Sequence, residues 1–187
     1  MINNYKKPRK RGKYVKKIVQ DYCVLDLETT GLSWQDDKII EIGIVKVRNQ
    51  KIVDKYSQLI NPQRKINSFI TQLTGISNEM VINMPCIDDI KNDILDFIGN
   101  DIIIGHNTSF DLNFLANAFD KDINNEYMDT LQFSRKVYPY MKHHRLADMV
   151  ELLHLSHNEH RSLADSIATY ELYEHLKEKI IQECICI

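Results

Sequence analysis

Two carboxylates separated by a single residue are the most distinctive chemical feature of this sequence. Asp26 and Glu28 lie in the stretch Asp26-Leu27-Glu28-Thr29-Thr30-Gly31, directly after an apolar, β-prone run at 22–25. Side chains alternate along a strand, so both acids point to one face, about 6.6 Å apart along it. Such a pair repels unless a cation lies between, and Mg²⁺ or Mn²⁺ suits oxygen ligands best. Taken alone, the stretch favours a metal site only modestly over a strand that ends in a polar turn.

A second stretch joins an imidazole, an amide and a carboxylate. His106-Asn107-Thr108-Ser109-Phe110-Asp111 follows the short apolar run Ile102-Ile103-Ile104 and opens a predicted helix with Ser109 as its N-cap. An acid in the first turn favours the helix dipole, which is the structural explanation of Asp111. The functional explanation is that this strand adjoins the first one and brings Asp111 beside Asp26 and Glu28.

A third stretch, His160-Arg161-Ser162-Leu163-Ala164-Asp165, opens the last predicted helix. Ser162 and Asp165 have the spacing of a capping box, with Asp in the usual Glu position. His160 and Asp165 share a site most easily if His160 precedes the helix and Asp165 lies in its first turn. Histidine is the side chain best suited to accept a proton near neutral pH, although six other histidines are present.

The intervening sequence predicts three strands followed by alternating helices and short strands. Such an order indicates a mixed sheet with helices packed on its faces, and sites in such sheets form at strand ends. The predicted strands are 22–25 with the acids that follow, 39–48, 51–60, 101–105 and 127–128, and the predicted helices are 68–73, 87–98, 110–119, 130–138, 146–155 and 163–182.

Charge divides the chain into two parts. Residues 1–20 hold eight of the 24 basic residues and no acid, so the 16 that remain face 26 acids and residues 21–187 carry −10. We expect a flexible basic arm at 1–20, able to attract phosphates, followed by one folded domain at 21–187. Four cysteines without a C-x-x-C pair favour a reduced, cytoplasmic setting, and the sequence shows neither a signal peptide nor a membrane span.

Together the three stretches resemble the three exonuclease motifs of the DEDDh 3′–5′ exonucleases, in the DnaQ-like superfamily. They are similar to the family's D-x-E-T-T-G, H-N-x-x-F-D and H-x-A-x-x-D motifs, with Ser162 in place of the usual Ala. Leu73-Thr74-Gly75-Ile76 and Met128-Asp129-Thr130-Leu131 also resemble family segments. The resemblance covers about 22–175 and is nearest to the exonuclease domains of bacterial replicative polymerases, including the epsilon subunit of DNA polymerase III.

The resemblance implies an α/β, RNase H-like fold, with a mixed five-stranded sheet and helices on both faces. It also implies two-metal hydrolysis with two Mg²⁺ or Mn²⁺ ions. Asp26 is expected to bridge the ions, Glu28 and Asp165 to complete the ion that holds the attacking water, and Asp111 to support the second ion. His160 is expected to accept the proton of that water, so that the rate falls at low pH.

The implied substrate is the 3′ end of single-stranded or frayed DNA, released as nucleoside 5′-monophosphates in proofreading or repair. Six residues are expected to contact it: Thr29, Leu32, Thr74, His106, Asn107 and Phe110. Phe110 suits helix core as well as base stacking. RNA ends are the alternative substrate, since the partner of a 2′-OH is not visible in a sequence. A polymerase subunit is a possible partner, and a non-enzymatic binding module is the third reading, although no acid of the motifs is missing.

Overall fold

A five-stranded mixed sheet forms the centre of the computed structural model, which describes residues 11–156 and 160–187. The strands lie in the order β3-β2-β1-β4-β5. Their bounds are Tyr22–Thr29 for β1, Ile39–Arg48 for β2, Lys51–Leu59 for β3, Ile103–Gly105 for β4 and Tyr127–Asp129 for β5. β1 is therefore a central strand, and the acids of the first motif lie in its second half.

The sheet changes character at β1. β1 pairs antiparallel with β2, and β2 pairs antiparallel with β3. The β2–β3 hairpin turns at Asn49 and Gln50, both of which have positive φ, as the predicted two-residue turn requires. On its other edge β1 pairs parallel with β4, but only at Cys23 and Val24. The short β4 thus leaves the edge of β1 beyond Val24 without a strand partner.

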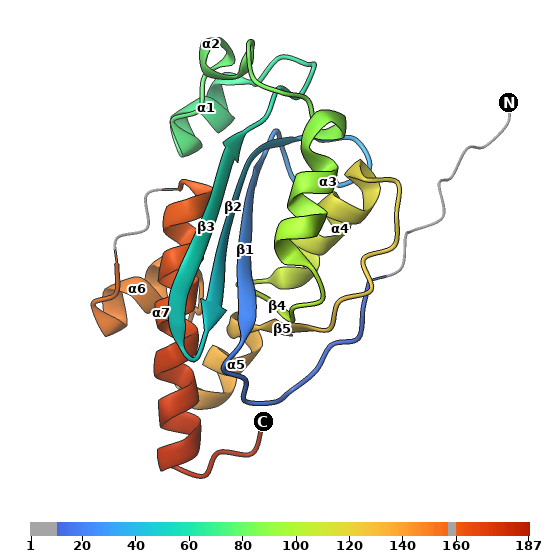
Figure 1. Cartoon of the computed structure of the whole chain (residues 1–187). Helices are drawn as coiled ribbons and strands as arrows, with labels where there is room; N and C mark the ends of the chain where they lie inside the picture. Colours follow the sequence, from blue (N-terminus) through green and yellow to red (C-terminus); the bar gives the residue numbers. More distant parts are fainter. Residues whose placement is uncertain (1–10, 157–159) are drawn as a thin grey trace, which may run out of the picture.

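Seven helices accompany the sheet in the described residues, and the two faces are covered by different ones (Figure 1). Residues from β1 and β2 pack with α3 and α4 in one apolar cluster, and with α5, α6 and α7 in another. α1 and α2 pack around Ile40 at one end of the sheet. The bounds are α1 Ser68–Thr74, α2 Asn78–Val81, α3 Ile87–Ile98, α4 Thr108–Ala118, α5 Thr130–Val137, α6 Leu146–Leu153 and α7 Ser162–Gln182.

The predicted fold class is confirmed: the chain is α/β, with a mixed five-stranded sheet and helices on both faces. The predicted helix at 68–73 ends at Gly75, which has the left-handed φ of 72° that favours glycine. Helix α2 was not predicted, because four residues are too short to show a helical period. In the described part of the chain no helix is long and apolar enough to cross a membrane.

Two predicted helix caps are wrong. The N-cap of α4 is Asn107, with a left-handed φ of 72°, and Ser109 lies inside the helix. Ser162 is the first residue of α7 rather than its cap, and its buried hydroxyl has no hydrogen-bond partner among the described residues. The capping-box spacing of Ser162 and Asp165 was therefore misleading, since another element satisfies the start of α7.

Half of the predicted flexible arm runs along the sheet. Arg11 and Tyr14 form isolated parallel bridges with Ile123 and Tyr127, and Lys17 pairs with Glu126. The Val15 amide donates to the Tyr127 carbonyl at 2.9 Å. Residues 11–17 therefore lie beside β5 and the segment before it, while the prediction for 1–10 falls outside the described residues.

Candidate active site

β1 presents Asp26 and Glu28 to the face of the sheet that α7 covers. They alternate in phase with Tyr22 and Val24, whose side chains are buried in the cluster that includes α7 residues. On β2, Gly43 lies opposite Asp26 and Glu41 lies opposite Glu28. The strand pair therefore carries three acids and one position without a side chain.

Gly43 allows α7 to begin directly against the sheet. A Cβ at this position would lie 2.3 Å from the backbone nitrogen of Leu163, so only glycine fits. Ser166 then donates a hydrogen bond from its hydroxyl to the Gly43 carbonyl at 2.9 Å. This close docking brings Asp165, in the first turn of α7, over the face of β1 that bears Asp26 and Glu28.

Asp26, Glu28 and Asp165 form a compact group, with one carboxylate oxygen of each within 4.8 Å of the others. Asp111 lies outside this group but borders it. Its buried carboxylate accepts a hydrogen bond from the backbone of Leu27, the residue between Asp26 and Glu28. That contact uses the edge of β1 that the short β4 leaves open. All four predicted acids therefore meet along β1.

Burial raises the pKa of all four predicted acids, and repulsion from neighbouring acids adds to it. For Asp26, burial is the largest cause and the charge of Asp111 is the next. Burial and the charge of Asp165 raise the pKa of Glu28 to about 8, and burial and Glu41 raise that of Asp165 to about 7. Burial also raises the pKa of Asp111, opposed by its backbone hydrogen bonds. The protein alone thus disfavours the ionised forms that these side chains would have in water.

The group fits a divalent cation. One carboxylate oxygen of Asp165 is buried and has no hydrogen-bond partner among the described residues. A buried carboxylate oxygen normally has a donor, and here the nearest charged neighbours are other acids. All the candidate ligands are oxygens, which Mg²⁺ and Mn²⁺ prefer. An ion among them would satisfy the unpaired oxygen and offset the repulsion at once.

Glu41 and Arg161 are the residues that sequence reasoning missed. Glu41 is only 2% exposed. Its carboxylate accepts hydrogen bonds from Arg161 Nε at 3.1 Å and from Arg161 Nη2 at 2.5 Å. It also accepts from the backbone N–H of Ser162 at 2.9 Å, so a strand side chain caps α7. The available signal was a lone acid inside the apolar run Ile39-Ile40-Glu41-Ile42, since a buried acid needs a partner.

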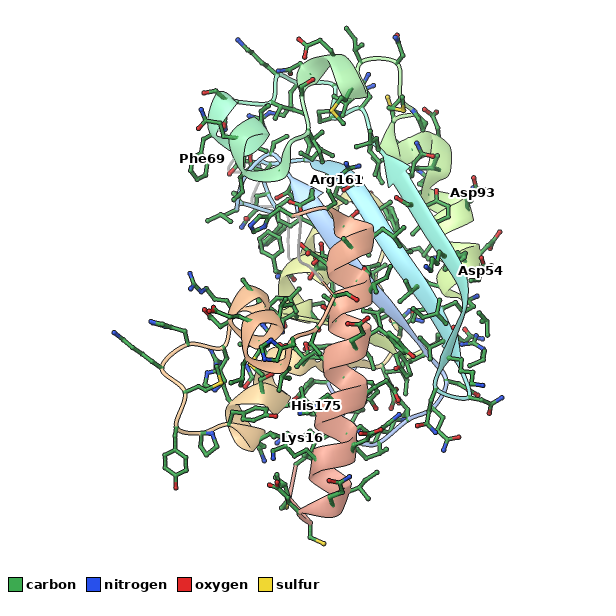
Figure 2. The ribbon with its side chains drawn as sticks, turned by 90° about the vertical axis from the view of Figure 1, so that its left-hand side faces the viewer. Lys16, Asp54, Phe69, Asp93, Arg161 and His175 are labelled. Atoms are coloured by element: carbon green, nitrogen blue, oxygen red, sulfur yellow. The ribbon has the colours of Figure 1, made fainter. Side chains whose placement is uncertain are left out.

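His160 lies at the approach to α7, outside the compact group of carboxylates. It is exposed and its backbone has a positive φ of 50°. Arg161 follows it, at the upper end of α7 in Figure 2, and is held by Glu41. The ion pair between Arg161 and Glu41 therefore constrains the backbone on which His160 stands.

His106 is bonded within the chain through both ring nitrogens. Its Nε2 lies 2.8 Å from the His144 carbonyl, and its Nδ1 lies 2.9 Å from the Thr130 hydroxyl. Burial lowers the pKa of His106 to about 4, so the ring is neutral at physiological pH. The neighbouring Asn107 donates its backbone N–H to Asp129, whose own pKa is raised by burial. His106, which follows β4, is therefore bonded both to the start of α5 and to the loop between α5 and α6.

The other predicted substrate contacts differ in exposure. Leu32 is 86% exposed, beyond the end of β1, whereas Thr29 and Thr74 are buried. Thr74 donates its hydroxyl to the Ile70 carbonyl and accepts from the Ile76 amide, which closes α1. Phe110 is half-buried and packs against Phe114, with ring centroids 4.8 Å apart. The sequence left two roles open for Phe110, packing in the helix core and stacking on bases. The ring packs against Phe114, and the residue is not fully buried.

Fold and carboxylates together define an α/β protein of the metal-dependent hydrolase class. The exonuclease family model RNase_T matches residues 23–173, which include every motif discussed above. The chain therefore belongs to the exonuclease family. The predictions of an RNase H-like exonuclease fold and of a 3′–5′ exonuclease are confirmed.

Similar proteins agree with this assignment. The PolC-type DNA polymerase III of Caldanaerobacter subterraneus subsp. tengcongensis is 38% identical over 164 residues, which is 86% of this chain and 12% of that protein. The Bacillus subtilis PolC-type enzyme is 39% identical over 166 residues, 85% of this chain and 12% of that protein. The chain thus spans only 12% of the length of these relatives.

Solved structures share the fold. Exonuclease X in complex with 5′ overhanging duplex DNA superposes with a TM-score of 0.70 at 26% identity, covering 88% of this chain and 94% of that one. Escherichia coli exonuclease I in complex with a dT13 oligonucleotide gives a TM-score of 0.75 at 16% identity, covering 89% and 43%. The second likeness shows the fold alone.

Proposed function

We propose that this chain removes nucleotides from the 3′ end of single-stranded or frayed DNA and releases nucleoside 5′-monophosphates. The observation that carries the proposal is the meeting of Asp26, Glu28 and Asp165 within 4.8 Å, with Asp111 beside them. DNA is favoured over RNA because the similar polymerases are DNA polymerases and exonuclease X was solved with DNA. Frayed ends are favoured because a paired end must first unstack.

We assign the four motif acids to two divalent ions, Mg²⁺ or Mn²⁺. The ions, when bound, supply the positive charge that lets a phosphate diester approach this acidic site. Asp26 lies centrally, since it is repelled by Asp111 on one side and by Asp165 on the other. Glu28 and Asp165 would hold one ion together with Asp26, and the Asp165 oxygen that lacks a hydrogen-bond partner among the described residues would be one of its ligands. Asp111, fixed by the Leu27 amide, supports the other ion.

His160 is the proposed general base. Its ring takes a proton from the attacking water, and the exposed position before α7 lets the proton pass on to solvent. Exposed Leu32 and half-buried Phe110 offer apolar surfaces to the bases of the terminal nucleotides, and Thr29 offers its backbone. His106 and Thr74 act by holding the walls of the site, because their polar atoms are engaged within the chain.

The setting that we propose is the bacterial cytoplasm, in replication or repair, with a DNA polymerase subunit as a possible partner. The support is the similarity to PolC-type polymerases, of which the chain matches one segment. All four cysteines are free thiols, and two of them, Cys184 and Cys186, are exposed, as suits a reducing compartment.

The decisive experiment offers matched DNA and RNA oligonucleotides, labelled at the 5′ end, with Mg²⁺ or Mn²⁺ and with a chelator. We expect a ladder that shortens from the 3′ end, mononucleotide 5′-phosphates as the product, faster loss of DNA than RNA, and no reaction with the chelator. An Asp26→Asn variant controls for contaminating nucleases. Cleavage inside the strand, equal activity in the chelator, or a preference for RNA would each overturn part of the proposal.

A further inference from the structure

A basic cavity next to the carboxylates is unexplained by the chemistry above. It has a volume of about 390 Å³ and lies between the start of α4, helix α5 and the loop that joins α5 to α6. Its cationic lining is Arg135, Lys142 and Arg145, and no carboxylate lines it among the described residues. This is unusual in a domain whose residues 21–187 carry −10.

Two of these cations are available to a ligand. Arg145 is already paired with Asp148, at 2.8 Å. Arg135 and Lys142 are exposed, and within the described part of the chain neither has an ion-pair partner within 4.0 Å. Two such cations that face one cavity create a local positive potential, which attracts anionic groups.

Histidine hydrogen bonds hold the cavity in shape. His144 places its carbonyl on the ring of His106, 2.8 Å away, and its own ring Nε2 lies 2.9 Å from the Tyr138 carbonyl. These bonds tie the α5–α6 loop, which projects to the left of α7 in Figure 2, to the end of β4. Arg135 therefore stands on helix α5 and Lys142 on an anchored loop, so less conformational entropy is lost when a ligand binds.

The cavity adjoins the proposed reaction site. Asn107 lines it and is the N-cap of α4, and Asp111 follows one helical turn later, about 6 Å along the axis. We propose that this cavity binds the phosphodiester backbone of the substrate strand upstream of its 3′ end. The inference rests on the proposed function, because only a strand whose end lies at Asp26 and Asp111 would continue past Asn107.

Charge explains why such a site is needed. Metal ions at the acids offset the charge of the phosphate that reacts, but the next phosphates meet a strongly negative domain. Screening acts over about 10 Å at 0.1 M salt, so local cations decide whether the strand stays bound. Contacts to phosphates carry no sequence information, which suits an exonuclease that must process any sequence.

The first test compares two double variants on two substrates. Arg135→Gln with Lys142→Gln removes the cavity cations, and Lys51→Gln with Lys55→Gln removes two exposed lysines of β3 as a matched control. The substrates are a DNA oligonucleotide and the p-nitrophenyl ester of thymidine 5′-monophosphate, which has no upstream strand. We expect the cavity variant to raise KM for the oligonucleotide about tenfold and to leave the ester unchanged. The control should match wild type on both.

The second test locates the phosphates that the cavity holds. Methylphosphonates replace the phosphates of the oligonucleotide one at a time, and each removes one charge. In wild type we expect weaker binding at one or two upstream positions, and in the cavity variant no additional weakening there. The slope of log affinity against log salt should be shallower by about 0.7 for each phosphate that the variant no longer neutralises. DNA and RNA strands should be weakened alike, since groups that bind phosphate do not read the 2′-OH.

Several results would overturn the inference. An oligonucleotide KM equal to that of wild type in the cavity variant would do so, as would a methylphosphonate profile that the variant leaves unchanged. If wild type hydrolyses neither substrate, the proposed function fails instead. Fluorescence anisotropy with the same labelled oligonucleotide then still decides whether the cavity binds a strand.

Discussion

The two sides of the active site are built in different ways. Asp26 and Glu28 stand on one central strand, where their spacing follows from the pleat alone. His160 and Asp165 belong to the start of α7, which is held by Glu41 on β2, 120 residues earlier in the chain from Arg161. The difference shows that one half of the site is local and the other depends on a distant buried contact.

This contrast makes the strand side robust and the helix side conditional. The strand acids keep their relative positions as long as β1 pairs with β2. The helix side requires a glycine at 43, an ion pair between Arg161 and Glu41, and a hydrogen bond from the Ser162 amide. Changes far from the chemistry should therefore affect the helix side first.

The largest effect is expected from the strand side itself. Asp26→Asn removes a charge that lies between Asp111 and Asp165, and should lower kcat by at least about 10³-fold, because metal stabilisation of the transition state amounts to several kcal/mol. Circular dichroism should show an intact fold. Asp54→Asn, an exposed acid of β3, is the control and should leave kcat unchanged. Activity near wild type in Asp26→Asn would remove Asp26 from the site.

Loss of the proposed base, His160, should have the next largest effect. His160→Gln is expected to lower kcat by about 10²–10⁴-fold, the usual contribution of a general base. Thermal stabilisation by Mn²⁺ should remain, because the four carboxylates are intact. His154→Asn, at an exposed position with positive φ, serves as the control. If His160→Gln keeps full activity, or loses its response to Mn²⁺, His160 is not the base.

A smaller effect is expected when the link between the two sides is weakened. Glu41→Gln keeps the size of the side chain but removes the charge that holds Arg161, and should lower activity about 10–100-fold, as outer-shell changes do. The decrease should appear in kcat and in a higher Mn²⁺ requirement, with little change in oligonucleotide binding.

A double-mutant cycle distinguishes this positioning role from general destabilisation. Arg161→Gln in the Glu41→Gln background should add little, because the pair is already broken. Glu151→Gln, an exposed acid of α6, should behave as wild type. Additive effects for Glu41 and Arg161, or a decrease seen only in melting temperature, would contradict the positioning role.

The smallest effect concerns stability and pH. Carboxyl groups in the unfolded chain have pKa values near 4, whereas in the fold the pKa of Glu28 is about 8 and that of Asp165 about 7. Between about pH 4 and pH 8 the folded state therefore binds more protons than the unfolded chain does. The free energy of unfolding falls as the pH rises through this range. We expect the metal-free protein to lose at least about 3 °C in melting temperature between pH 6 and pH 8.

Two comparisons make that melting experiment specific. Mn²⁺ should remove the pH dependence, because ion binding favours the ionised acids. An Asp165→Asn variant should melt higher than wild type at pH 8 without metal, since a charge repelled by Glu28 is gone. A melting temperature that rises from pH 6 to pH 8 in the metal-free protein would contradict this electrostatic account.

Local pattern was enough to predict most elements of the fold. Strand β2, the Asn49-Gln50 turn and helix α3 have the predicted bounds, because each combines a clear period with a terminating residue. Two of the errors lie where a distant group takes the place of a local one. Ser162 does not cap α7 because Glu41 does, and residues 11–20 are not free of the domain because β5 offers an open edge.

The three motifs were enough to predict which acids and which histidine would form the site, since their spacing is a property of the chain. Only the tertiary structure decided how they meet. The ion pair of Glu41 with Arg161 and the contact of Asp111 with Leu27 join segments that are far apart along the chain. The basic cavity likewise brings Arg135 and Lys142 beside the start of α4. Such contacts depend on sheet order and helix docking, which no local spacing encodes.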